Sequence, residues 1–303
     1  MAFRLSAIDR LPEPPNVHAF RGTVVHRALQ LLMWEQAQGE RALPVAFTKL
    51  ERALDELLAG TEGRALALSG GALDTFVEET HELVRNYFVL EDPNSVRVIG
   101  TELRLEIDVV TGADQARLPG PDSGAGVHER EAPSHDEGAR SPGAGHVRLR
   151  GIIDRLELGP DGELTVTDYK TGRAPGQSQE LSRLGGLHFY ALLCEQFLGK
   201  RPATVQLLYV REPLAICCTP SDQSIAGLGR QAAAIWAAIE RACLLEDFRP
   251  KPGPLCEWCG FHAYCPAMGG DLPLAHPAPE HGDAAGPGET ATGLVDLPLA
   301  TAR

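Results

Sequence analysis

The hydrophobic pattern of this 303-residue chain changes its period near residue 97, and that change constrains the fold more than any other feature. Before it, apolar residues recur every three or four positions, which predicts amphipathic helices. These helices are expected over 22–38, 44–59 and 72–90. After it, apolar and polar residues alternate, which predicts half-buried strands. These strands are expected over 97–110, 147–158 and 163–171.

A further series of elements follows the third predicted strand. We expect a helix over 179–198, strands over 204–210 and 214–219, and an Ala-rich helix over 222–244. The run Gly159-Pro160-Asp161-Gly162 is a strong hairpin signal and predicts antiparallel pairing of the strands on either side. The predicted fold class is therefore α/β, or α+β, with an antiparallel meander in a central mixed sheet flanked by helices.

Two stretches have a composition that does not support a packed core. Residues 111–146 and 269–303 are dense in Gly, Pro and charged residues and hold few apolar side chains to bury. We interpret the first as a disordered insertion and the second as a disordered tail. The remaining sequence, 1–268, is expected to form one domain.

Composition excludes few classes of function. Lys and Arg number 28 against 41 Asp and Glu, a net charge of −13, which is weak evidence against a broadly basic nucleic-acid surface. No apolar run approaches the roughly 20 residues that span a bilayer, and the N-terminus lacks the pattern of a signal peptide. We therefore expect a cytoplasmic protein without a membrane partner.

The chemically informative stretch is the pair of predicted strands around residues 152–170. Asp154 follows an apolar run, and Asp168 and Lys170 share one face of the next strand because side chains alternate. Two carboxylates brought together by a hairpin repel each other unless a cation lies between them, and oxygen ligands suit Mg²⁺ or Mn²⁺. An ion pair on a solvated strand face is the simpler interpretation of Asp-x-Lys alone.

Three motifs in a fixed order make the chain resemble a known family. They are Gly22-Thr23-Val24-Val25-His26, Gly151-Ile152-Ile153-Asp154-Arg155 and Asp168-Tyr169-Lys170-Thr171-Gly172. Together they resemble the PD-(D/E)XK nucleases of the RecB/AddB type, including stand-alone actinobacterial RecB-like exonucleases. The resemblance covers about residues 5 to 268 apart from the insertion, and it implies a restriction-endonuclease-like core.

The resemblance implies a role for each matching residue. Asp154 and Asp168 would be the metal-binding carboxylates and Lys170 the catalytic lysine, with Mg²⁺ or Mn²⁺ as the cofactor. His26 would supply a metal ligand from the first helix. Glu102 resembles the family's acidic residue on the strand before Asp154, with Glu106 as an alternative if the register differs.

The same resemblance implies contacts to DNA. Tyr190 matches the tyrosine of the family's Q-x-x-x-Y helix, but Gly186 stands where the glutamine is expected. This departure puts affinity or strand polarity in doubt without excluding catalysis. Arg155 and Arg173 are the basic residues near the site that we expect to contact phosphates.

Cys256, Cys259 and Cys265 form a C-x2-C-x5-C cluster near the end of the predicted domain. It resembles the iron–sulfur segment of AddB-type nucleases, at about 245–268, and so implies a [4Fe-4S] cluster. A zinc knuckle or unligated thiols are the alternatives. The fourth ligand is missing, since Cys243 would need an unusual geometry. Our hypothesis is that Met1 is an internal methionine and that the fourth cysteine lies just upstream. The other cysteines are expected to be buried apolar residues: Cys194, Cys217 and Cys218.

The resemblance therefore implies a metal-dependent deoxyribonuclease, an exonuclease acting on single-stranded ends in DNA recombination or repair. No P-loop of the G-x-x-x-x-G-K-[ST] type is present, so any unwinding requires a helicase partner. The alternative is a non-catalytic DNA-binding or helicase-partner module with a degenerate nuclease fold. A zinc-binding structural protein is a more distant alternative.

Overall fold

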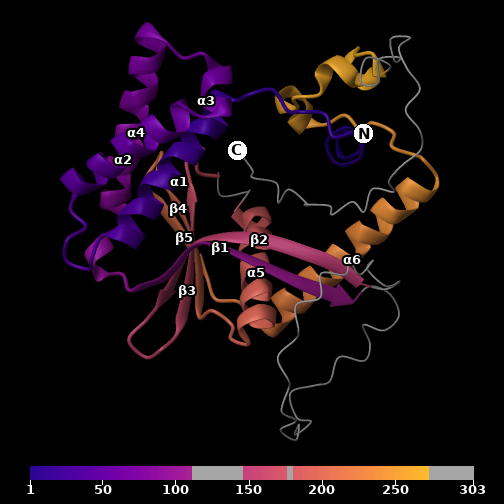
Figure 1. The fold of residues 1–303 in the computed structure, drawn as a ribbon. Coiled ribbons are helices and arrows are strands. Elements are labelled where there is room, and N and C mark those ends of the chain that lie inside the picture. The colour runs from indigo at the N-terminus through magenta and orange to yellow at the C-terminus, as the bar shows by residue number, and fades with distance from the viewer. Residues whose placement is uncertain (111–145, 176–179, 273–303) are drawn as a thin grey trace, which may run out of the picture. The chain divides into compact units, whose positions relative to one another are not determined.

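The structure, a computed structural model, describes residues 1–110, 146–175 and 180–272 (Figure 1). By internal packing the chain divides into two units. Of the described residues, the larger unit comprises Pro12–Ile107 and the part of Arg150–Leu228 that is described, and the smaller includes Met1–Leu11 and 229–272. The predicted disordered segments, 111–146 and 269–303, lie almost entirely outside the described residues, so those predictions stay untested.

Four helices open the larger unit and lie together beside the sheet (Figure 1). They are α1 (Val17–Glu35), α2 (Leu43–Leu58), α3 (Thr61–Leu66) and α4 (Gly70–Leu90). Helix α1 begins five residues earlier than predicted because the Asn16 side chain caps it, accepting hydrogen bonds from the His18 and Ala19 N–H groups. The apolar faces of α1, α2 and α4 meet in one buried core that includes Leu29, Leu50 and Val84.

The sheet has five strands in the order β1-β2-β3-β4-β5. Their bounds are Val98–Val110, His146–Leu158, Leu164–Lys170, Thr204–Tyr209 and Leu214–Cys218. Strands β2 and β3 pair antiparallel, β3 and β4 parallel, and β4 and β5 antiparallel. The mixed sheet and the flanking helices confirm the predicted fold class. The predicted β2–β3 hairpin is also present, with Gly162 at φ +78° in its turn.

Helix α5 (Glu180–Leu198) packs on β2 at a position where only glycine fits. A Cβ atom on Gly151 would lie 2.5 Å from Leu193 Cδ1 and 2.8 Å from Phe189 Cε1. The glycine of the Gly151-to-Arg155 motif therefore lets the helix approach the strand that carries Asp154. Helix α6 (Asp222–Leu244) follows the sheet and continues into the smaller unit.

In the smaller unit, the start of the chain packs against the cysteine segment. A π-helical turn, Arg4–Ile8, places Leu5 in a buried cluster with Phe261, and Met1, Cys259 and Tyr264 pack around them. The cysteine segment itself consists of short 3₁₀ turns, Pro254–Trp258, His262–Tyr264 and Pro266–Met268. Within the described part of the chain, none of the helices combines the length and apolar character of a membrane span.

Candidate active site

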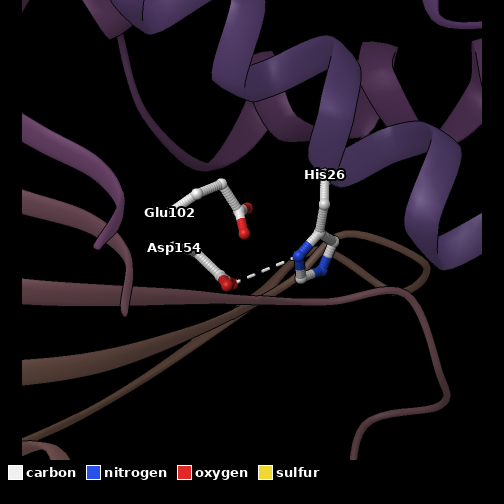
Figure 2. A group of neighbouring side chains, drawn as sticks. All are labelled: His26, Glu102 and Asp154. Carbon is white, nitrogen blue, oxygen red and sulfur yellow. Dashed lines mark ion pairs between the residues drawn. The ribbon is translucent and has the colours of Figure 1, made fainter. Parts of the chain in front are cut away.

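The centre of the site is formed by one residue from α1 and two from neighbouring strands. His26, Glu102 and Asp154 each offer a ligand atom, and these three atoms all lie within 4.8 Å of one another (Figure 2). His26 Nδ1 is 3.4 Å from Asp154 Oδ2. One imidazole and two carboxylates form a donor set suited to a divalent metal ion.

Asp168 and Lys170 lie beside this group on β3. Lys170 Nζ is 2.6 Å from Asp168 Oδ2, and the Tyr190 hydroxyl on α5 donates to Asp168 Oδ1 at 2.5 Å. Asp168 is nearly inaccessible, whereas a quarter of the Lys170 side chain stays exposed. The structure therefore brings together the five residues predicted for the metal and catalytic centre. Within it, Asp168 forms an ion pair with Lys170, and Glu102 lies with His26 and Asp154.

The main chain of Tyr169 contacts two of these residues. Its N–H donates to Asp154 Oδ2 at 2.7 Å, and its carbonyl oxygen is 3.0 Å from His26 Nε2. A carbonyl only accepts, so Nε2 carries a proton in this contact and Nδ1 is the nitrogen that faces Asp154. This role of Tyr169 depends on main-chain atoms and therefore leaves no residue-type signal in the sequence.

The electrostatics of the site favour a bound cation. Burial and the neighbouring Asp154 charge raise the pKa of Glu102 and of Asp168 above their usual range. Burial alone would raise the pKa of Asp154 too, but the adjacent His26 lowers it. For His26, burial lowers the pKa, yet the Asp154 carboxylate outweighs it and raises the value to about 9. Carboxylates packed this closely are costly to ionise together without a positive charge between them.

The backbone of β1 is distorted at Glu102. This residue has φ +49°, in the left-handed region that non-glycine residues adopt at a cost. The distortion coincides with the placement of the Glu102 carboxylate beside His26 and Asp154. Glu106, the alternative register, instead forms an ion pair with Arg150. The structure thus brings Glu102, and not Glu106, to the site.

An open cavity of about 540 Å³ gives access to this group from the side of α1. Its lining includes His26, Glu102 and Lys170 together with Thr23 and Thr171. Helix α1 approaches β3 closely here, since a Cβ atom on Gly22 would lie 3.0 Å from Thr171 Oγ1. The glycine of the first motif therefore has a steric role next to the site.

The structure corrects one predicted DNA contact and qualifies another. The Arg155 side chain has no exposed surface, and its guanidinium is bound to Glu91 and Glu157, so it does not contact a phosphate in this structure. Tyr190 is also buried and its hydroxyl is bound to Asp168. Arg173 is exposed just beyond the cavity residue Gly172, and its predicted contact with DNA stays a prediction.

The three clustered cysteines lie in the smaller unit and are partly buried. Main-chain hydrogen bonds order the segment, with the Cys259 N–H donating to the Cys256 oxygen at 3.1 Å. Among the described residues, His26, Glu102 and Asp154 form the one set of three or more possible ligand atoms that all lie within 4.8 Å of one another. The three cysteine sulfur atoms are therefore not all that close together. Cys243 lies on α6 beside an apolar cavity that Phe3 and Ile8 also line.

A comparison with protein families identifies the superfamily of the chain. The profile of the PD-(D/E)XK nuclease superfamily matches residues 1–266, so the chain belongs to this superfamily. It is accordingly a nuclease of the hydrolase class, with DNA as the implied substrate and a divalent metal as the typical cofactor. No curated protein matches the chain. Among solved structures, that of SSO0001 aligns with a TM-score of 0.35 and 13% identity, covering 82% of this chain and 85% of the other.

Proposed function

We propose that the chain is a Mg²⁺- or Mn²⁺-dependent exonuclease that degrades single-stranded DNA ends in recombination or repair, as RecB/AddB-type nucleases do. The observation that carries the catalytic part is the convergence of His26, Glu102 and Lys170 on one open cavity. The carboxylates of Asp154 and Asp168 lie directly beside these groups. The RecB/AddB assignment is supported by the three motifs containing His26, Asp154 and Asp168. A degenerate module would have little reason to keep this arrangement.

The residues present fit a divalent metal ion. His26, Glu102 and Asp154 already bring their ligand atoms within 4.8 Å of one another. Burial, and next the Asp154 charge, raise the pKa of Glu102, so a bound cation would favour its ionised form. Asp168 lies next to them and remains the further predicted ligand. When bound, a metal ion lowers the pKa of a coordinated water and neutralises charge developing on a phosphate.

The chain's own groups supply the remaining requirements of phosphodiester hydrolysis. The Lys170 ammonium lines the cavity, where it can donate to a phosphate oxygen or orient the attacking water. Asp168 fixes this lysine through their 2.6 Å ion pair, and Tyr190 in turn fixes Asp168. The attack forms a bond from the water oxygen to phosphorus as the water loses a proton to solvent. The bond from phosphorus to the leaving deoxyribose oxygen breaks, and that oxygen takes up a proton.

The proposal is tested with purified protein on three DNA substrates: end-labelled single strands, blunt duplexes and closed single-stranded circles. We expect mononucleotides or short oligonucleotides from the linear single strand, in Mn²⁺ or Mg²⁺ but not in EDTA. The circle should stay intact. Cleavage of the circle would show endonuclease action, and cleavage in EDTA by wild type and Asp168→Asn alike would overturn the metal-dependent mechanism.

We also propose that Cys256, Cys259 and Cys265 ligate a [4Fe-4S] cluster, with a fourth ligand from outside this segment. Support comes from the spacing and from the packing of the chain's first residues on the same segment, through Leu5 and Phe261. A metal tie between segments far apart in sequence closes a long loop. Anaerobically purified protein should contain iron and sulfide and lose both in Cys259→Ser. Stoichiometric zinc without sulfide would support the zinc alternative. A helicase partner is proposed on the resemblance alone.

A further inference from the structure

A buried charged network lies on the face of β3 opposite the catalytic groups. Asp168 and Lys170 point to one face of the strand, so Tyr169, between them, points to the other. There the Tyr169 ring joins the core of helices α1, α2 and α4 and meets the Tyr87 ring edge-on, with 5.7 Å between their centroids. The Tyr169 side chain thus anchors the strand from behind the site.

Arg155 is the centre of this network. Its Nη1 donates to the Tyr169 hydroxyl at 2.8 Å and to the Tyr87 hydroxyl at 3.1 Å. Two carboxylates neutralise it: Glu91, through Nη2 at 2.9 Å, and Glu157, through Nε at 2.8 Å. The Thr167 hydroxyl is a fifth polar partner of this wholly buried guanidinium. Any movement of the guanidinium is costly, because each lost partner leaves a buried donor unpaired.

The network is continuous with the site through a single residue, Tyr169. Arg155 follows Asp154 in β2 and lies opposite Thr167 in the β2–β3 register. Next to that pair, the Tyr169 N–H and carbonyl hold Asp154 and His26. A shift of residue Tyr169 as a whole would therefore move the main-chain groups that orient both candidate metal ligands, and the bond from its hydroxyl to Arg155 resists such a shift.

We propose that Arg155 is a positioning residue: by fixing the Tyr169 side chain it fixes the Tyr169 main-chain N–H and carbonyl, which orient Asp154 and His26 for metal binding. The inference rests on the proposed metal site. A buried Arg155 can position Tyr169, whereas a side chain with no exposed surface does not reach a DNA phosphate. Partners that orient metal ligands from behind commonly change metal affinity by about 10- to 100-fold when removed.

The test uses Tyr169→Phe, which removes the hydroxyl that binds Arg155 and keeps the ring and the peptide. Mn²⁺ binding to the full chain is measured by electron paramagnetic resonance of free Mn²⁺, with urea unfolding alongside. We expect the Kd for Mn²⁺ to rise about tenfold in Tyr169→Phe and further in Arg155→Met. The matched control is Arg41→Met, since Arg41 is a buried arginine of the same unit that donates to the carbonyls of Met33, Pro93 and Val96. This control should lose stability and keep wild-type Mn²⁺ affinity.

A second measurement does not depend on metal. In ¹⁵N-histidine-labelled protein without metal, the His26 Nε2–H bound to the Tyr169 carbonyl should give an exchange-protected signal, identified by its absence in His26→Gln. We expect Tyr169→Phe and Arg155→Met to lose this signal and Arg41→Met to keep it. Wild-type affinity together with an unchanged signal in Tyr169→Phe would overturn the inference. Absence of Mn²⁺ binding in wild type would instead remove the proposed metal site, and the signal would still decide the positioning role.

Discussion

The His26 imidazole and the Asp154 carboxylate form the ion pair at the centre of the site, and their interaction is linked to pH. The Asp154 charge raises the pKa of His26 from its ordinary value of 6.5 to about 9. The folded state therefore holds the His26 proton more tightly than the unfolded chain does. This contribution to stability is complete below about pH 6.5 and is lost as the pH rises through about 9.

This linkage gives a prediction for the metal-free protein. The difference in free energy of unfolding between wild type and His26→Gln should be largest near pH 6 and should shrink between pH 7 and 10. Urea unfolding in EDTA at a series of pH values measures it. A difference that stays constant over this range would show that the His26–Asp154 pair is not formed in solution.

At Tyr190, the structure makes a prediction that differs from that of the sequence motif. Because its hydroxyl donates to Asp168, Tyr190→Phe should lower the cleavage rate at saturating DNA by about tenfold or more and change DNA affinity little. Single-turnover cleavage and DNA binding by fluorescence anisotropy separate the two effects. A loss of affinity with an unchanged rate would restore the direct DNA contact.

At the scale of elements, the site depends on the close approach of α1 to the end of β3. Gly22 allows this approach, because the first added side-chain atom would already be 3.0 Å from Thr171 Oγ1. Most helical glycines behave differently: replacement by alanine stabilises a helix by roughly 0.5–1 kcal/mol where space is open. Gly71 in α4 is such a position, with nothing within 4 Å of an added Cβ atom.

We therefore predict opposite effects on stability from adding a side chain at Gly22 and at Gly71. Gly22→Val should destabilise the protein by about 1–3 kcal/mol through overpacking and should reduce cleavage, since α1 also carries His26. Gly71→Ala should leave cleavage unchanged and stabilise slightly. Urea unfolding and single-turnover cleavage on the two variants measure both effects. Wild-type cleavage by Gly22→Val would mean that the helix and strand are not held this closely.

At the scale of the whole molecule, the N-terminal segment and the cysteine segment share one small core. Leu5 and Phe261 are its two buried members, separated by most of the sequence. Leu5→Ala should destabilise this unit by roughly 2–5 kcal/mol. Limited proteolysis should then cut near the cysteine segment sooner than in wild type, and the iron content should fall. Equal proteolysis of the two proteins would argue against this packing.

The sequence predicts much of this architecture because its signals are local. Alternation places Asp168 and Lys170 on one strand face, and the hairpin turn sets that strand beside Asp154. Other features depend on tertiary contacts that a local pattern does not contain. Arg155 reads as a surface charge until Glu91, 64 positions away, is seen to neutralise it. Glu102 reaches the site through an unusual backbone angle, and the parallel pairing of β3 with β4 has no local signal.

The central claim is that the site containing Asp168 and Lys170 hydrolyses DNA. Its most direct test is single-turnover cleavage of labelled single-stranded DNA in Mn²⁺ by wild type, Lys170→Ala and Lys200→Ala. Lys200 is an exposed lysine of the same unit whose Nζ donates to the Gly162 carbonyl. The account predicts a rate loss of about 100-fold or more for Lys170→Ala and an unchanged rate for Lys200→Ala. Equal rates in wild type and Lys170→Ala, or no cleavage by either, would contradict it.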